Sequence, residues 1–204
     1  MTIAQKVAHD LLQIGAVTLR PNEPFTWASG MKSPIYCDNR LTISYPEVRN
    51  QICAGLVEIV KMRYADAEVI AGTATAGIPH AAWLADQLNL PMIYVRSKPK
   101  DHGQSKQIEG VIKPGKKVVV IDDLISTGGS VLKAVEAVKQ AGAEVIGVAG
   151  IFSYELAAAT TNFQKANLPL QTVTTYSTLI HVAKAEDQIS DAELAILKQW
   201  RQQG

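Results

Sequence analysis

Cysteine and long apolar runs are scarce in this sequence of 204 residues. Its two cysteines, Cys37 and Cys53, have neither the spacing of metal ligands nor the density of a secreted disulfide scaffold, so we expect free thiols in a reducing, cytoplasmic environment. No apolar run reaches the roughly 18 residues that a membrane span needs. The N-terminus also lacks a charged segment followed by an apolar one, so neither a membrane segment nor a signal peptide is expected.

Net charge is also nearly absent. The chain has 20 Lys and Arg against 19 Asp and Glu, which leaves a formal charge of +1. Such a protein has no overall field that would favour nucleic acid or a membrane surface as a partner, so any basic binding site must be local. The hydrophobic content of 47% is enough for a sizeable core and excludes a disordered chain.

Short apolar runs alternate with helical patterns through most of the chain. The apolar runs cover residues 68–72, 92–95, 118–121 and 145–152, and the helical patterns cover about 79–89, 129–140, 154–165 and 190–202. This alternation is typical of βαβ units around a parallel sheet that is buried on both faces. We therefore predict an α/β fold with an open, mainly parallel sheet flanked by helices.

The residues that precede this pattern have a different composition and periodicity. Apolar residues recur at helical spacing from Ile3 to Ile14, and a second helix is predicted from about Pro46 to Tyr64. Between them, residues 17–44 are rich in Pro, Gly, Ser and aromatics, which favours short strands and turns. We interpret the chain as a single domain, residues 1–204, with an N-terminal hood (about residues 1–44) on an α/β core (about 45–204).

Three polar loops follow predicted strands, at residues 72–79, 96–110 and 122–129. In open parallel sheets, ligands bind beyond the carboxyl ends of the strands. We therefore expect the three loops to converge on one rim.

The third loop has the most informative chemistry. In "VVVIDDLISTGGSV", residues 118–131, the stretch from Ser126 to Ser130 connects a strand to a helix, so main-chain N–H groups, three hydroxyls and the helix dipole face one point. That arrangement predicts a phosphate nest. Neither GxxxxGK[ST] nor GxGxxG is present, and a nest without its own lysine favours a phosphomonoester held by neutral donors.

Asp122 and Asp123 lie immediately upstream of this nest. Carboxylates at such a position accept hydrogen bonds from vicinal ribose hydroxyls or reach a bound Mg²⁺ through water. The alternative is that the pair only caps the following turn.

Residues 118–131 resemble the phosphoribosyl-pyrophosphate (PRPP) signature of type I phosphoribosyltransferases: four apolar residues, two acids, two apolar residues, then a loop of hydroxyls and glycines. The resemblance implies the type I phosphoribosyltransferase fold but does not identify the base. Two further segments resemble the orotate phosphoribosyltransferases. Residues 95–110 (VRSKPKDHGQSKQIEG) are similar to that family's mobile catalytic loop, and residues 25–39 (FTWASGMKSPIYCDN) to its segment that covers the pyrimidine.

This resemblance implies an Mg²⁺-dependent pentosyltransferase that transfers the 5-phosphoribosyl group from PRPP to orotate. The products would be orotidine 5'-phosphate and pyrophosphate, in de novo pyrimidine (UMP) biosynthesis. It also implies a cytoplasmic homodimer with shared active sites and with no nucleic acid or membrane partner.

The resemblance also assigns site residues. The expected catalytic residues are Arg96, Lys100, His102, Asp122 and Asp123. The three basic residues would reach PRPP in the neighbouring subunit. The two acids would bind Mg²⁺ indirectly, through water or PRPP. The residues expected to bind PRPP are Thr73, Ala74, Thr75, Arg96, Lys100, His102, Asp122, Asp123, Leu124, Ile125, Ser126, Thr127, Gly128, Gly129 and Ser130. For orotate the resemblance gives Ser126, and we also expect contacts from Lys32, Tyr36, Cys37 and Arg40.

Some positions depart from the better-known bacterial pattern. Ala28 and Ala76 replace frequent lysines, the mobile loop opens Arg96-Ser97 in place of Arg-Lys, and Ser153-Tyr154 replaces a frequent Asp-Arg pair. These departures lie in segments that are expected to contact pyrophosphate or orotate. We hypothesise that Lys32 and Arg40 supply the missing positive charge near the orotate carboxylate.

Three other functions share parts of this pattern. A purine or uracil phosphoribosyltransferase would have the same PRPP loop but no need of the hood or of "KDHG". A regulator that senses PRPP while binding RNA or DNA is disfavoured by the near-zero net charge and the lack of a helix-turn-helix segment. A phospho-acceptor signalling domain would need its acids after the first strand.

His9, His80 and His181 have no functional context in the sequence and are interpreted as structural.

Overall fold

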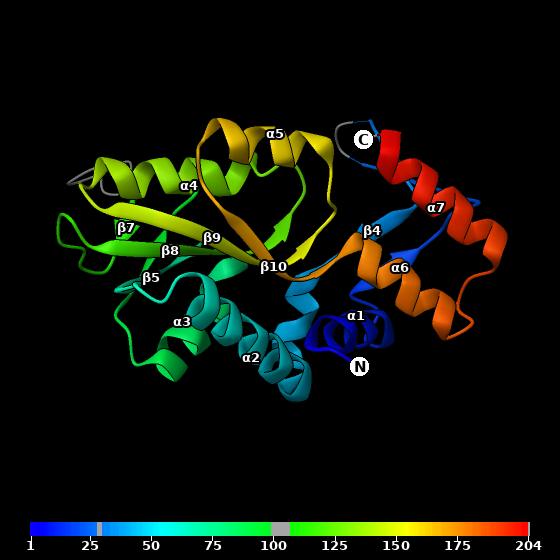
Figure 1. Ribbon diagram of the computed structural model, residues 1–204, viewed down its shortest axis with the longest axis horizontal. Helices are drawn as coiled ribbons and strands as arrows, with labels where there is room; N and C mark the ends of the chain where they lie inside the picture. Colours follow the sequence, from blue (N-terminus) through cyan, green and yellow to red (C-terminus); the bar gives the residue numbers. More distant parts are fainter. Residues whose placement is uncertain (28–29, 99–106, 204) are drawn as a thin grey trace.

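A six-stranded sheet flanked by helices on both faces is the centre of this protein (Figure 1). The computed structural model describes residues 1–27, 30–98 and 107–203. The open, mainly parallel sheet covered by helices confirms the predicted fold class. No helix in the described ranges combines the length and the hydropathy that a membrane crossing requires.

The strand order in this sheet is β10-β9-β8-β5-β6-β7. All neighbours are parallel except β7, which runs antiparallel to β6. This order puts β8 and β5 in the middle of the sheet, where both of their edges are paired. The bounds are β5 Val69–Thr73, β6 Met92–Val95, β7 Ile108–Glu109, β8 Lys117–Ile125, β9 Glu144–Ser153 and β10 Leu170–Thr175.

Helices α2 (Pro46–Arg63) and α3 (Gly77–Leu88) cover one face of the sheet, and α4 (Gly129–Gln140) and α5 (Ala157–Lys165) cover the other (Figure 1). Successive residues of β8 alternate between the two hydrophobic clusters beneath these layers, with Val119 in one and Val120 in the other. Because both faces of β5, β8 and β9 are largely buried, these strands show up in the sequence as apolar runs.

Three more helices lie at one end of the sheet. Helix α1 (Ile3–Gln13) is held at its start by a capping box between Thr2 and Gln5, and it buries an apolar face against α2, α6 and β10. Helix α6 (Tyr176–Ala185) and helix α7 (Asp191–Gln203) follow β10 and pack against each other. We did not predict α6. Its start is marked by Thr175, whose hydroxyl accepts a hydrogen bond from the N–H of Thr178 at 3.3 Å.

The rest of the hood consists of short paired strands. Strand β1 (Val17–Leu19) pairs antiparallel with β4 (Ile35–Cys37), and β2 (Phe25–Thr26) pairs antiparallel with β3 (Lys32–Ser33). These short strands were predicted. The 3-10 helix η1 (Asn39–Ser44) that follows them was not, and it begins where the carboxylate of Asp38 accepts from the N–H of Arg40 at 3.2 Å.

Strand β8 is longer than predicted. The apolar run ends at Ile121, but the strand continues to Ile125, so Asp122 and Asp123 lie within it and do not begin the loop. The extension has a non-local cause, because β9 runs alongside and pairs Asp122 with Gly150 and Ile125 with Ser153.

Candidate active site

The carboxyl ends of β5, β6 and β8 lie side by side at one edge of the sheet. Thr73 pairs with Val95, and the N–H of Ala74 donates to the carbonyl of Val95 at 2.8 Å. The described parts of the three polar loops therefore meet at one rim, as predicted. Residues 99–106 of the second loop, which include Lys100 and His102, lie outside the described residues.

The two acids of β8 are tied to the neighbouring strand β5. The hydroxyl of Thr73 donates to Oδ1 of Asp122 at 2.6 Å, and the N–H of Asp123 donates to the same oxygen at 3.0 Å. Burial raises the pKa of Asp122. Burial also raises the pKa of Asp123, and repulsion from Asp122 raises it further. A cation or a set of hydroxyl donors at this point would relieve the cost of holding two charged acids here.

The turn from β8 into α4 is fixed from one side by α5. The side-chain amide of Asn162 donates to the carbonyl of Thr127 at 2.9 Å. Gly128 has a φ of 78°, and a Cβ there would come within 2.6 Å of the ring of Phe163. Because the residue before α4 is this glycine, no side chain caps the first turn of the helix, so its N–H groups remain available to an anion.

The turn between β5 and α3 lies at the same rim. Gly77, the first residue of α3, approaches β8 so closely that a Cβ would come within 2.5 Å of the carbonyl oxygen of Ile121. The peptide bond between Ala74 and Thr75 is cis. The close approach of Gly77 places this turn beside the strand that carries the two acids.

The hood contacts the site directly. The side-chain amide of Asn39 donates to the main-chain carbonyl of Asp123 at 2.6 Å, and the thiol of Cys37 donates to Oδ1 of Asn39 at 3.2 Å. Burial, together with the nearby charges of Asp123 and Asp38, raises the pKa of the Cys37 thiol well above its usual value. Cys37 is therefore a neutral, buried donor, whereas Tyr36 beside it is 46% exposed.

The two basic residues proposed for orotate have partners within the hood. The guanidinium of Arg40 donates to both carboxylate oxygens of Asp38, at 2.6 and 2.7 Å. This contact lowers the pKa of Asp38, and the charge of Arg40 also acts to lower the pKa of Asp123. The ammonium of Lys32 donates to the hydroxyl of Thr26 at 2.6 Å.

Arg96 lies at the base of the second loop. Its N–H donates to the carbonyl of Gln107 at 2.8 Å, and the side-chain amide of Gln107 donates back to the carbonyl of Arg96 at 2.8 Å. Its guanidinium lies 3.8 Å from the carboxylate of Glu109. These contacts bring residues 96 and 107, which flank the stretch containing Lys100 and His102, next to each other.

Thr73 and the two acids were predicted from the sequence, but Asn39 was not, because it carries no chemical signal within "CDNR". His80 is buried on α3, with Nε2 3.3 Å from the hydroxyl of Thr42, and burial lowers the pKa of His80 to about 4. His9 pairs with Glu186 at 2.6 Å, on the α1 side of the molecule. Neither contact links these histidines to the two acids.

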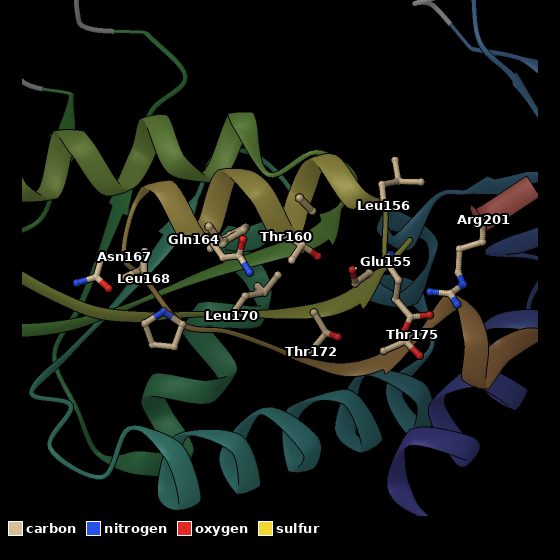
Figure 2. Close-up of a pocket in the computed structure, with 14 residues that line it drawn as sticks. Glu155, Leu156, Thr160, Gln164, Asn167, Leu168, Leu170, Thr172, Thr175 and Arg201 are labelled. Atoms are coloured by element: carbon tan, nitrogen blue, oxygen red, sulfur yellow. Dashed lines mark hydrogen bonds between the residues drawn. The ribbon is translucent and has the colours of Figure 1, made fainter. Parts of the chain in front are cut away.

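A separate groove of about 770 Å³ lies between α5 and the edge strand β10. Figure 2 shows Thr160 and Gln164 of α5, Thr172 of β10 and Arg201 of α7 around it. The groove begins at Ser153, the residue that pairs with Ile125 of β8. None of the predicted site residues that the structure describes lines it, so this groove and the rim that carries the two acids are different surfaces.

Comparisons with known proteins point to one family. Residues 48–177 match the phosphoribosyl transferase domain family. The chain is 64% identical over 200 residues to an orotate phosphoribosyltransferase of Lactiplantibacillus plantarum, which covers 98% of this chain and 94% of that protein.

Solved structures show the same likeness. The orotate phosphoribosyltransferase of Aeropyrum pernix has a TM-score of 0.77 and 29% identity, over 90% of this chain and 99% of that one. An orotate phosphoribosyltransferase of Mycobacterium tuberculosis, solved in complex with PRPP, has a TM-score of 0.66 and 25% identity, over 87% of this chain and 99% of that one.

Proposed function

Because this chain belongs to the orotate phosphoribosyltransferase family, we infer that it transfers the 5-phosphoribosyl group of PRPP to orotate. The products are orotidine 5'-phosphate and pyrophosphate, in pyrimidine (UMP) biosynthesis. The structural observation that carries this inference is the pair of acids in β8. Thr73 anchors the pair, and the loop that follows it leads to the uncapped start of α4.

The reaction breaks the bond between C1 of the ribose and the pyrophosphate oxygen, and positive charge develops on the sugar while negative charge develops on the leaving group. Catalysis therefore depends on charges and dipoles that are already in place, and on keeping water from C1. We propose that the turn from Ser126 to Ser130 holds the 5-phosphate and that Asp122 and Asp123 orient the ribose hydroxyls. The raised pKa of each acid supports this role, since hydroxyl donors would stabilise the charged forms.

The pyrophosphate end needs positive charge and N–H donors. We propose that residues 73–75 supply main-chain and hydroxyl contacts, while Arg96, Lys100 and His102 supply charge from the neighbouring subunit of a homodimer. The contacts between Arg96 and Gln107 support the role of the second loop, because they fix both ends of a polar segment next to β5.

Mg²⁺ fits this arrangement as a substrate-bound ion. Two neighbouring carboxylates with raised pKa values are suited to a nearby cation. Among the described residues no group of three or more His, Cys, Asp or Glu could hold a metal ion, so Mg²⁺ would take most of its ligands from PRPP and water, with Asp122 and Asp123 acting indirectly. When bound, the ion neutralises charge on the pyrophosphate.

For orotate we propose contacts from Ser126, Lys32, Tyr36, Cys37 and Arg40. The hydrogen bond from Asn39 to Asp123 supports this proposal, because it holds the segment that carries Tyr36 and Cys37 against the acid-bearing strand. We further propose that the hood and the α/β core form one domain of residues 1–204, and that the enzyme is cytoplasmic.

A spectrophotometric assay of orotate loss with PRPP and Mg²⁺ tests the function. We expect turnover with orotate that depends on PRPP, and little or none when adenine, xanthine or uracil is the acceptor. Faster turnover of one of those bases would assign the chain to a different phosphoribosyltransferase. Omission of PRPP, and replacement of Asp123 by Ala, are the negative controls.

A further inference from the structure

Helix α7 is joined to the hood by its tryptophan. The indole N–H of Trp200 donates to the main-chain carbonyl of Lys32 in β3 at 2.9 Å, although the two residues are 168 positions apart in the chain. The ring of Trp200 lies 6.0 Å from that of Trp27 and 6.4 Å from that of Tyr154, centroid to centroid. One side chain thus contacts the hood and the residue that follows β9.

The helix that carries this tryptophan is itself firmly held. The hydroxyl of the buried Tyr176 donates to the carbonyl of Leu197 at 3.0 Å, and the ring of Tyr176 lies 5.4 Å from that of Trp200. The ammonium of Lys184 lies 3.1 Å from the carboxylate of Asp191 at the start of α7. Trp200 therefore projects from a fixed support and not from a loose terminus.

Two hydrogen bonds tie the hood to other elements on either side of Tyr36 and Cys37, two of the proposed orotate residues. Trp200 holds it at Lys32, and Asn39 holds it at the carbonyl of Asp123. The segment between these points contains Tyr36 and Cys37, and β4 is paired only with β1 of the hood in the described structure. The placement of this segment relative to the end of β8 is therefore set by both attachments, together with the burial of Ile35 and Cys37 in the main hydrophobic cluster.

We propose that Trp200 is a positioning residue for orotate: through its hydrogen bond to Lys32 and its packing on Trp27 and Tyr154, it sets the position of residues 32–37 relative to Asp123. The inference rests on the proposed function for its choice of substrate. Trp200 bonds directly to the hood, whereas the phosphate turn at residues 126–130 is fixed by Asn162 and Phe163 of α5. Its loss therefore affects orotate recognition and leaves PRPP recognition in place.

Steady-state kinetics of Trp200→Phe and Trp200→Ala test this proposal. Trp200→Phe keeps a ring in place and removes the N–H, and it should raise KM for orotate roughly threefold, as expected for one lost hydrogen bond. Trp200→Ala should raise it roughly tenfold, because a small displacement of binding groups has a large effect. In both variants KM for PRPP and kcat should stay within about twofold of the wild type.

Trp83→Phe is the matched control, since Trp83 lies on α3, where it packs on Arg49 and His80, and its replacement should leave all three constants unchanged. Parallel changes in both KM values and kcat for Trp200→Phe would mean a general structural role and would overturn the proposal. An unchanged KM for orotate in Trp200→Ala would overturn it as well.

Hydrogen exchange separates this inference from the proposed function, because it needs no substrate. Trp200→Ala should speed amide exchange in residues 32–37 and leave residues 118–125 as protected as in the wild type. Unchanged exchange in residues 32–37 would overturn the positioning role even in an active enzyme. A wild-type protein that does not turn over orotate would instead overturn the proposed function, and with it the assignment of orotate as the molecule positioned.

Discussion

The main-chain N–H of Asp123 donates to the side chain of Asp122, the residue just before it, at 3.0 Å. Asp122 also receives the hydroxyl of Thr73, so its carboxylate has two donors on one oxygen. These contacts hold the pair in one geometry, but burial still raises the pKa of both acids. The ligand-free protein therefore maintains two carboxylates at a place that disfavours their charge.

Replacing Asp123 by Asn should stabilise the ligand-free protein at pH 8 while nearly abolishing activity. The folded-state pKa of Asp123 lies above the unfolded value of about 3.9, so folding favours the protonated form. The contribution of Asp123 to stability is therefore greatest below pH 3.9 and is lost as the pH rises through the folded-state pKa.

Denaturant unfolding of wild type and Asp123→Asn at several pH values measures this effect. We expect the variant to be more stable by about 0.5–2 kcal/mol at pH 8, the range usual when a strained functional group is removed, with the difference disappearing near pH 4. Activity should fall by about 10²- to 10³-fold. A variant less stable than the wild type at pH 8 would contradict the argument.

Replacing Gly128 by Ala should distort the phosphate turn. The substitution adds the cost of a positive φ to a clash with the ring of Phe163, and we expect a loss of about 1–3 kcal/mol in unfolding free energy together with a higher KM for PRPP. Gly115→Ala is the control, because Gly115 has a similar φ of 76° and no neighbour within 4 Å of the added atom. Equal losses in the two variants would mean that Phe163 does not restrain the turn.

Replacing Lys100 by Ala should lower kcat far more than it weakens PRPP binding. If this ammonium stabilises the departing pyrophosphate, its loss removes about 10²–10³ in rate, or ~3–4 kcal/mol. Stopped-flow or equilibrium binding of PRPP, measured beside kcat, separates the two effects. Lys98→Ala, at an exposed position of the same segment, is the comparison, and equal losses in binding and kcat would point to simple anchoring.

Replacing Arg40 by Ala tests the hypothesis about the orotate carboxylate. The guanidinium is paired with Asp38 in the ligand-free protein and would have to share its donors with orotate. We expect KM for orotate to rise roughly tenfold, as for one lost charge-assisted contact, with KM for PRPP unchanged. Orotate affinity that is the same in Arg40→Ala and the wild type would remove Arg40 from this role.

The regular part of the fold was predictable because its signals are local. Strand β6 and helix α4 have the predicted bounds, since a buried parallel strand and an amphipathic helix each leave their own periodicity in the sequence. The signature at residues 118–131 likewise contains its chemistry within one short segment.

The features that escaped prediction depend on residues far apart in the chain. Strand β8 extends to Ile125 because β9 lies beside it, and no pattern within residues 122–125 indicates that pairing. The hydrogen bond from Asn39 to Asp123 joins residues 84 positions apart. An asparagine in a turn-rich segment carries no signal for such a contact. The short strands and turns of the hood could therefore be predicted, but its attachment to β8 could not.

The attachment of the hood by Trp200 also has a consequence for biosynthesis on the ribosome. Residues 191–203 are made after every strand of the sheet, so the sheet and the phosphate turn can collapse before the hood gains its contact with Trp200. Within one newly made chain, the segment of residues 32–37 would thus reach its final position after the phosphate turn.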